Sequence, residues 1–246
     1  MKIDYEHQAE IYEQTRNTEP LVYSMLSNLL KLSKKDIVLD FGCGTGNYLK
    51  QFVIDYGIIP YGIEPATNMR EIAQKKLQSG CILAGDDTYI PFSDILFNKI
   101  YCTDVIHHIK QLDIFFQHIY NIAASGARFC ICTESFQQLG EKYWIQYFPE
   151  LLDIDLQRFH PIENIIKTGE STGWIYREML KTEDELIAPI STSFINRVRN
   201  KTLSVFHLIS NDAYERGMLL MEEDYRQKTL LNQHEGYTFI LFERRK

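Results

Sequence analysis

Three glycines follow a short apolar segment in the stretch VLDFGCGTGN, and this stretch constrains the fold more than any other. The residues before it are typical of a buried strand, and Gly42, Gly44 and Gly46 are spaced two apart. Glycine adopts backbone angles that other residues avoid, so this spacing predicts a tight turn between the strand and a following helix. A strand, a glycine turn and a helix in this order favour a nucleotide-binding α/β fold.

Apolar runs and helical patterns alternate along the first half of the chain. The runs predict buried parallel strands at 37–41, 61–64, 81–84, 99–103 and 127–133. The helical patterns lie between them, at 46–56, 67–77 and 112–124. This alternation predicts an α/β fold with a doubly wound, Rossmann-like sheet.

The alternation stops after residue 133. We expect a helix over 162–171 and two further strands at 174–180 and 237–244. The interval between those strands, about 181–235, contains no repeat and no low-complexity linker. It therefore predicts a helical insertion packed on a single domain that spans residues 1–246.

The composition is that of an ordinary globular chain. With 246 residues, 45% of them hydrophobic and 24% charged, the chain is long enough for one large domain. It shows neither an apolar run that could span a membrane nor an apolar signal-peptide core, so we expect a cytoplasmic protein. The net charge of −7 argues against a surface that neutralises nucleic acid phosphates.

The five cysteines do not follow a metal-binding pattern, because none of them forms a C-x-x-C pair. Cys130 and Cys132 are two apart in an apolar run, so both would face the same side of a strand. We expect buried thiols and no metal site.

The glycine spacing also separates two kinds of nucleotide ligand. Dinucleotide-binding turns follow the pattern G-x-G-x-x-G, whereas Asn47 stands here in place of the third glycine. Glu64 ends the second predicted strand about twenty residues later, where a carboxylate could accept hydrogen bonds from ribose hydroxyls. The two features together favour a nucleoside ligand other than NAD, and a structural glycine turn is the alternative.

Four motifs in this sequence resemble those of the class I S-adenosylmethionine-dependent methyltransferases, in their small-molecule (Methyltransf_11-like) branch. VLDFGCGTGN resembles the first motif, YGIEPATNM the ribose-binding second strand, AGDDTYIPF the loop facing the adenine, and IYCTDVIHHI the fourth strand and its exit. The motifs stand in the family's order within residues 5–134. The resemblance implies a seven-stranded sheet whose last strand, supplied by GYTFILFERR, runs antiparallel to the others.

The resemblance also implies a site for S-adenosyl-L-methionine, whose product is S-adenosyl-L-homocysteine. Glu64 would bind the ribose hydroxyls, and Met69 would pack against the adenine. Asp86 or Asp87 would reach the adenine amino group; the pattern does not separate the two, and a solvated turn pair is the alternative. The expected cofactor residues are Tyr12, Arg16, Asp40, Gly42, Cys43, Gly44, Gly46, Asn47, Glu64, Pro65, Met69, Asp86, Asp87 and Thr103.

The segment YEHQAEIYEQTR resembles a helix that precedes the first strand in many relatives, and we expect a cap helix over about 1–32. Tyr12 and Arg16 are four residues apart and share a helical face, with Tyr5 two turns back. Arginine could pair with the methionine carboxylate, and the tyrosine rings could face the sulfonium. A surface amphipathic helix is the alternative.

Two histidines, His107 and His108, follow the fourth predicted strand, where side chains face the transferred methyl group in relatives of this type. The imidazole pKa lies near neutrality, so either histidine could act as the catalytic base and accept a proton from an amine or hydroxyl. Because the sulfonium is already activated, positioning of the nucleophile without a base is the alternative mechanism. A structural role for both histidines is the third possibility.

The expected acceptor-binding residues are Tyr5, Glu134, Tyr143, Trp144 and Tyr147. An aromatic wall with a carboxylate suits a cationic or amine-bearing small molecule, and anchoring a helical cap is the alternative role. The sequence identifies neither the acceptor atom nor whether the protein is a monomer or a homodimer.

Three readings of the function follow. The leading one is an enzyme that methylates a small molecule through a nitrogen or oxygen atom. A methyltransferase acting on RNA or protein is the first alternative, although TDVIHH stands where many enzymes that methylate planar amino groups carry NPPY. A non-catalytic S-adenosylmethionine-binding protein or a nicotinamide-dependent oxidoreductase is the other alternative, and the oxidoreductase would need the third dinucleotide glycine.

Overall fold

The computed structural model describes residues 18–78 and 80–246, which form two compact units. The first, the sheet unit, is formed by the described residues of 18–133, 161–180 and 238–246. The second, the insertion unit, is formed by residues 134–160 and 181–237. The insertion unit therefore contains the predicted interval 181–235 and also the aromatic segment that follows the fifth strand.

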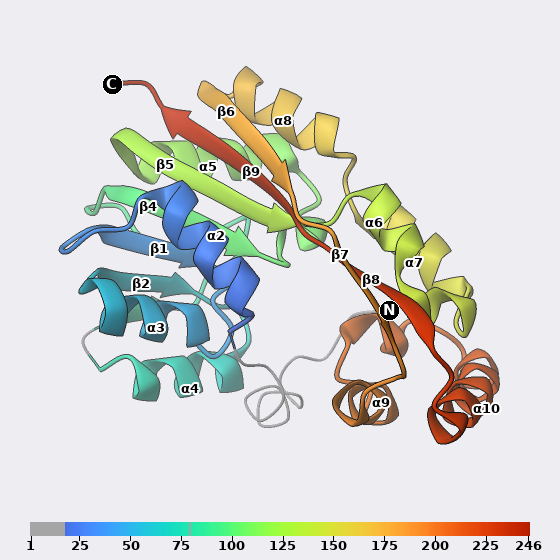
Figure 1. Cartoon of the computed structure of the whole chain (residues 1–246). Helices are drawn as coiled ribbons and strands as arrows, with labels where there is room; N and C mark the ends of the chain where they lie inside the picture. Colours follow the sequence, from blue (N-terminus) through green and yellow to red (C-terminus); the bar gives the residue numbers. More distant parts are fainter. Residues whose placement is uncertain (1–17, 79) are drawn as a thin grey trace. The chain divides into compact units, whose positions relative to one another are not determined.

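The sheet unit is built on a seven-stranded sheet with the strand order β3-β2-β1-β4-β5-β9-β6 (Figure 1). The strands are β1 (Ile37–Phe41), β2 (Ile59–Ile63), β3 (Cys81–Leu83), β4 (Phe97–Thr103), β5 (Ala123–Thr133), β6 (Trp174–Lys181) and β9 (Thr238–Arg244). Strands β1 to β5 pair in parallel, and β9 pairs antiparallel to β5 from Arg128↔Glu243 to Thr133↔Thr238. The predicted doubly wound sheet and its antiparallel last strand are confirmed.

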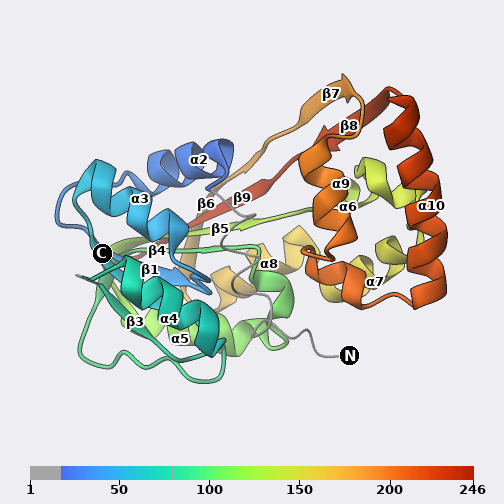
Figure 2. The ribbon, with the colours of Figure 1, turned by 90° about the horizontal axis from the view of Figure 1, so that it is seen from below.

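Helices cover both faces of this sheet (Figure 2). They are α2 (Pro20–Leu30), α3 (Asn47–Tyr56), α4 (Thr67–Lys76), α5 (Leu112–Ile122) and α8 (Ile162–Ser171). On one face, Phe52 of α3 stacks on Tyr23 of α2 and meets the edge of Tyr101 on β4. On the other face, Phe116 of α5 packs against Phe129 and Phe242. No helix within residues 18–78 and 80–246 is both long and apolar enough to cross a membrane.

Element boundaries differ from the prediction at α5 and β5. The helix predicted over 112–124 ends at Ile122, because β5 begins at Ala123 and pairs there with Phe97. A register shift between Phe97 and Lys99 accommodates the longer strand. The expected cap helix covers about 1–32, and residues 1–17 of it lie outside the described residues. The described remainder contains the helix α2.

The insertion unit combines helices with a two-stranded ribbon. Its elements are α6 (Phe136–Glu141), η2 (Tyr143–Gln146), α7 (Glu150–Arg158), β7 (Asp184–Ala188), α9 (Thr192–Arg199), η3 (Ser204–His207), α10 (Asn211–Gln227) and β8 (Leu231–Glu235). Strands β7 and β8 pair antiparallel, so the two ends of the predicted helical interval lie side by side as strands. The helices α9 and α10 lie between them in the chain, as predicted for this interval.

Glycine permits close packing of α10 against the core of the insertion unit. A Cβ atom on Gly217 would lie 2.2 Å from a ring carbon of the buried Phe148 and 2.6 Å from the carbonyl oxygen of Tyr147. Gly140 of α6 differs, because a Cβ atom there would meet nothing within 4 Å. The two helical glycines therefore predict opposite effects of a methyl group.

We expect Gly217→Ala to lower the free energy of unfolding by about 1–3 kcal/mol, because overpacking outweighs the better helix propensity of alanine. Gly140→Ala, the matched control, is expected to raise it by about 0.5–1 kcal/mol. Urea unfolding of both variants measures the two changes. Equal effects of the two substitutions would contradict this account of the packing.

Candidate active site

The glycine turn joins β1 to α3 at the carboxyl edge of the sheet. Gly42, Gly44 and Gly46 have φ angles of 78°, 54° and 76°, in the left-handed region that favours glycine. A Cβ atom on Gly42 would also lie 2.4 Å from the side chain of Val105. The amides of Gly42 and Cys43 donate to the carbonyl of Ile63, and the amide of Gly46 donates to the carbonyl of Cys43. The turn thus uses these amides within the protein, and the first turn of α3 is the part next to it that can bind an anionic ligand group.

Glu64 connects this turn to the next strand. It directly follows β2, and its Oε2 accepts a hydrogen bond of 2.9 Å from the amide of Gly44. Its Oε1 accepts another of 2.9 Å from the amide of Ala66, before α4. The buried carboxylate thus lies beside the glycine turn at the point where the strand order reverses between β1 and β4, the usual ligand position in this type of sheet.

Asp40 is a second carboxyl group at the same place, fully buried near the end of β1. The hydroxyl of Tyr101 donates to its Oδ2 at 2.8 Å, whereas Oδ1 has no hydrogen-bond partner among the described residues. Burial raises the pKa of Asp40 to about 8. The hydrogen bond from Tyr101 lowers this pKa, whereas the charge of Glu64 raises it further. Asp40 therefore holds a proton at neutral pH.

The loop after β3 contains the two predicted adenine-binding acids. Asp86 Oδ1 accepts hydrogen bonds from the amide and hydroxyl of Thr88 at 2.9 and 2.6 Å, and from the amide of Tyr89 at 3.1 Å. The carbonyl oxygen of Asp87 lies 3.0 Å from Nδ1 of His118 on α5. Asp86 is thus held through its side chain and Asp87 through its main chain.

The other predicted cofactor residues of the sheet unit surround the same turn. Cys43 donates its amide to Ile63 of β2, and Asn47 at the start of α3 accepts a hydrogen bond from Lys76 of α4. Met69 is buried on α4 together with Ala66. Pro65 lies in the turn after Glu64, and Thr103 ends β4.

His107 and His108 lie in η1 (Ile106–His108), just beyond the carboxyl end of β4. Asp104 turns the chain there with a φ of 55°, and its amide donates to the carbonyl of Cys132 at 3.1 Å. The two imidazole rings are 4.1 Å apart between centroids. Val105 directly precedes η1, and its side chain lies against Gly42. The two histidines therefore come two and three residues after a residue that contacts the glycine turn.

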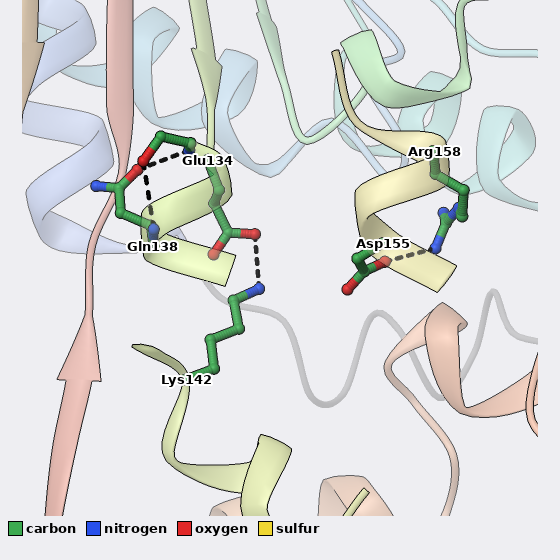
Figure 3. A network of polar contacts seen from close by, with 6 residues as sticks. Glu134, Gln138, Lys142, Asp155 and Arg158 are labelled. Carbon is green, nitrogen blue, oxygen red and sulfur yellow. Dashed lines mark hydrogen bonds and ion pairs between the residues drawn. The ribbon is translucent and has the colours of Figure 1, made fainter. Parts of the chain in front are cut away.

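The predicted acceptor residues described by the structure belong to the insertion unit, where each has structural contacts; Figure 3 shows those of Glu134. The carboxylate of Glu134 accepts a 2.7 Å hydrogen bond from Lys142. The hydroxyl of Tyr147 donates to Asp224 at 2.6 Å. Tyr143 and Trp144 each pack against Phe194, with 5.0 Å between ring centroids.

Charged side chains of the insertion unit contact one ring of this aromatic group and pair with one another. The ammonium of Lys142 lies 5.1 Å from the centre of the Trp144 ring, and Arg158 pairs with Asp155 at 3.1 Å (Figure 3). Burial raises the pKa of Asp155, while the charges of Lys142 and Arg158 act in the opposite direction. The Glu134 carboxylate is therefore already balanced by a lysine, which weakens its expected attraction for a cationic acceptor.

Three predicted residues, Tyr5, Tyr12 and Arg16, lie outside the described residues. The structure in turn adds residues that the sequence patterns did not reveal. Tyr101 lies in an apolar strand segment, and its hydroxyl makes a hydrogen bond to Asp40, 61 positions away in the sequence. Arg70 lies one residue beyond the motif YGIEPATNM, and only its position on the predicted helix over 67–77 could have suggested a contact.

The proton on Asp40 predicts a pH dependence of stability. An unfolded aspartate ionises near pH 4, so between about pH 4 and pH 8 the folded state binds more protons than the unfolded state. The free energy of unfolding should therefore fall as pH rises through this range, with a contribution of up to about 1.4 kcal/mol per pH unit.

Asp40→Asn should remove this contribution and make the pH profile flatter, as measured by urea unfolding between pH 4.5 and pH 8 without added ligand. Asp113→Asn, at an exposed aspartate of α5, is the control and should retain the slope of the original protein. An unchanged slope in Asp40→Asn would show that Asp40 ionises normally in the folded state.

Comparisons with known proteins agree with this geometry. Residues 39–131 match the family Methyltransf_11, described as a methyltransferase domain. An uncharacterized methyltransferase of Oceanobacillus iheyensis is 40% identical over 89 residues, which are 36% of this chain and 41% of the relative. The chain thus spans about two fifths of the length of that relative.

Solved structures share the fold over nearly the whole chain. A putative methyltransferase from an antibiotic biosynthesis pathway of Anabaena variabilis has a TM-score of 0.73 and 23% identity, covering 93% of this chain and 98% of that one. Phosphoethanolamine N-methyltransferase 2 of Haemonchus contortus, solved with S-adenosyl-L-methionine, has a TM-score of 0.63 and 16% identity, covering 100% of this chain and 61% of that one. Residues 39–131 are therefore similar to a methyltransferase domain, and the chain shares the fold of these solved structures.

Proposed function

We propose that this chain is a methyltransferase that binds S-adenosyl-L-methionine at the glycine turn of the sheet unit and methylates a small-molecule acceptor. The observation that carries the proposal is the Glu64 carboxylate, which is held by the amides of Gly44 and Ala66 beside that turn. A nucleoside ligand needs a hydroxyl acceptor at this position, and the carboxyl end of β2 provides it. The sulfonium cofactor supplies an activated methyl group when it is bound.

The residues around the turn fit the other parts of the cofactor. The first turn of α3, which follows the glycine turn, can bind the methionine carboxylate. Met69 offers a buried apolar side chain on α4, and the loop held by Asp86 offers polar groups for the adenine. The missing third dinucleotide glycine, replaced by Asn47, argues against a nicotinamide dinucleotide at the same turn.

The two histidines can serve the transfer step. They follow β4 at the carboxyl edge of the sheet, next to the residue that packs against Gly42. An imidazole there would accept the proton of an amine or hydroxyl acceptor as the new bond to the methyl carbon forms. Holding the acceptor in line supplies the rest of the rate enhancement.

Acceptor selection is assigned to the insertion unit. The family match ends at residue 131, so the whole insertion unit lies outside the matched residues. Trp144 supplies half-buried aromatic surface within it, whereas Tyr143 is buried in its core. Tyr147 and Glu134 hold the surrounding helices. The net charge of −7 disfavours an RNA acceptor, which would need a basic surface.

Incubation with methyl-labelled S-adenosyl-L-methionine and a panel of amines and phenols tests the proposal. Labelled product from a small molecule supports it. Label in added RNA or protein, with none in the panel, would overturn the small-molecule assignment. Binding of S-adenosyl-L-homocysteine without transfer to any acceptor in the panel, RNA or protein would indicate a non-catalytic binding protein.

Glu64→Ala should weaken binding of S-adenosyl-L-homocysteine about ten- to a hundredfold, because a charged acceptor for the ribose hydroxyls is lost. Isothermal titration calorimetry gives the dissociation constant. Glu71→Ala removes an exposed carboxylate from α4 and should leave it unchanged. A folded Glu64→Ala variant with the original affinity would remove Glu64 from the site.

Replacing both histidines, in His107→Gln/His108→Gln, should lower kcat about a hundredfold or more and leave the affinity for S-adenosyl-L-homocysteine unchanged. The measurement uses the best acceptor from the panel. His234→Gln, on β8 of the insertion unit, serves as a control and should keep the original kcat. A kcat within threefold of the original in the double variant would show that positioning suffices without a base.

A further inference from the structure

Arg70 of α4 clamps the turn that carries Glu64. Its Nη1 donates to the carbonyl oxygen of Glu64 at 2.9 Å and to that of Pro65 at 3.1 Å. Its Nη2 donates to the hydroxyl of Thr67 at 3.3 Å. One guanidinium group thus connects the end of β2, the turn after it and the first residue of α4.

The helix itself cannot satisfy these carbonyl groups. The hydrogen bonds of α4 begin with the carbonyl of Ala66, which accepts from the amide of Arg70 at 3.0 Å. The carbonyls of Glu64 and Pro65 precede this point and lie outside the helical pattern. The side chain of Arg70 reaches back over one helical turn and supplies their donors.

The side chain of Glu64 is fixed through the same turn. Its Oε1 accepts from the amide of Ala66, so the direction of the carboxylate depends on the backbone between these two residues. Its Oε2 accepts from Gly44 only while that direction is kept. A contact that fixes the carbonyls of Glu64 and Pro65 therefore also fixes the carboxylate.

We propose that Arg70 is a positioning residue for cofactor binding, which holds the Glu64 turn so that the Glu64 carboxylate faces the ribose hydroxyls. This inference rests on the proposed function, because it assigns the ribose to Glu64. Arg70 acts through Glu64 and touches neither the ribose nor the reacting atoms.

The charge of Arg70 supports this role. Burial raises the pKa of the Cys43 thiol in the glycine turn, and the carboxyl groups of Asp40 and Glu64 add to the rise. The guanidinium of Arg70 acts on the same thiol in the opposite direction. The positive charge of Arg70 therefore acts on the glycine turn as well as on the turn that carries Glu64.

Lysine cannot make the same set of contacts. The guanidinium is a planar fork that donates through two nitrogens to acceptors on different residues, whereas an ammonium is a single donor point. Lysine at position 70 would keep the charge and most of the aliphatic stem. The pair of variants Arg70→Lys and Arg70→Met therefore separates the fork geometry from the charge.

A double-mutant cycle with Glu64 tests the inference, with the affinity for S-adenosyl-L-homocysteine measured by titration calorimetry. Arg70→Met should weaken binding about tenfold in the original protein and less than about twofold in the Glu64→Ala background. Arg70→Lys should bind S-adenosyl-L-homocysteine less than about threefold more tightly than Arg70→Met. If Arg70→Met does not fold, Arg70→Lys is used for the same cycle.

Gln74→Met provides the matched control. Gln74 also lies on α4 and donates to a backbone carbonyl, that of Ile82 on β3, at 2.9 Å. Its replacement removes a contact of the same kind without touching the Glu64 turn, so it should leave the affinity unchanged. An equal loss in Gln74→Met would show that any weakening of α4 suffices.

Two results have different meanings. If Glu64→Ala binds S-adenosyl-L-homocysteine as well as the original protein, the ribose assignment is wrong and the proposed site fails. If Glu64→Ala weakens binding but the Arg70 effect adds to it fully, or is absent, the site stands and the positioning role of Arg70 is overturned.

Discussion

The rest of the site depends on one buried carboxylate that two backbone amides hold. Glu64 connects the glycine turn after β1 to the turn after β2, through the amides of Gly44 and Ala66. Buried amides without acceptors would destabilise both turns, so the acid gives their conformations a common support. The two turns beside the proposed cofactor site are thus held together by contacts within the protein itself.

This arrangement places two acids close together in a buried environment. Asp40 and Glu64 cannot both ionise without mutual repulsion, and burial makes the repulsion stronger. The sheet unit resolves the conflict by keeping Asp40 protonated and bonded to Tyr101, while Glu64 receives the amides and the charge of Arg70 nearby. The two acids thus have different partners, because Asp40 bonds to a tyrosine hydroxyl and Glu64 to two backbone amides.

The sequence predicted the sheet because its signals are local: glycine spacing, apolar runs and an acid at a strand end. It could not predict the bond between Tyr101 and Asp40, since the two residues are 61 positions apart and nothing marks tyrosine as a partner. In the insertion unit, the aromatic segment was visible, but the pairing of Glu134 with Lys142 was not. Charge pairing comes from tertiary packing, and it changes what an acidic residue beside aromatic rings can bind.

The antiparallel strand β9 has a consequence for how the chain folds during synthesis. Ile131 of β5 pairs with Ile240 of β9, and 109 positions separate them in the chain. At ribosomal rates of roughly 5–20 residues per second, the edge of β5 waits about 5–20 s for its partner. Residues Phe239 to Phe242 of β9 are buried in the folded chain. Until β9 is synthesised, the edge of β5 that pairs with it is therefore unpaired, and the apolar surface that packs against these residues is uncovered. This interval is when the nascent sheet is most open to chaperones and to edge-to-edge association.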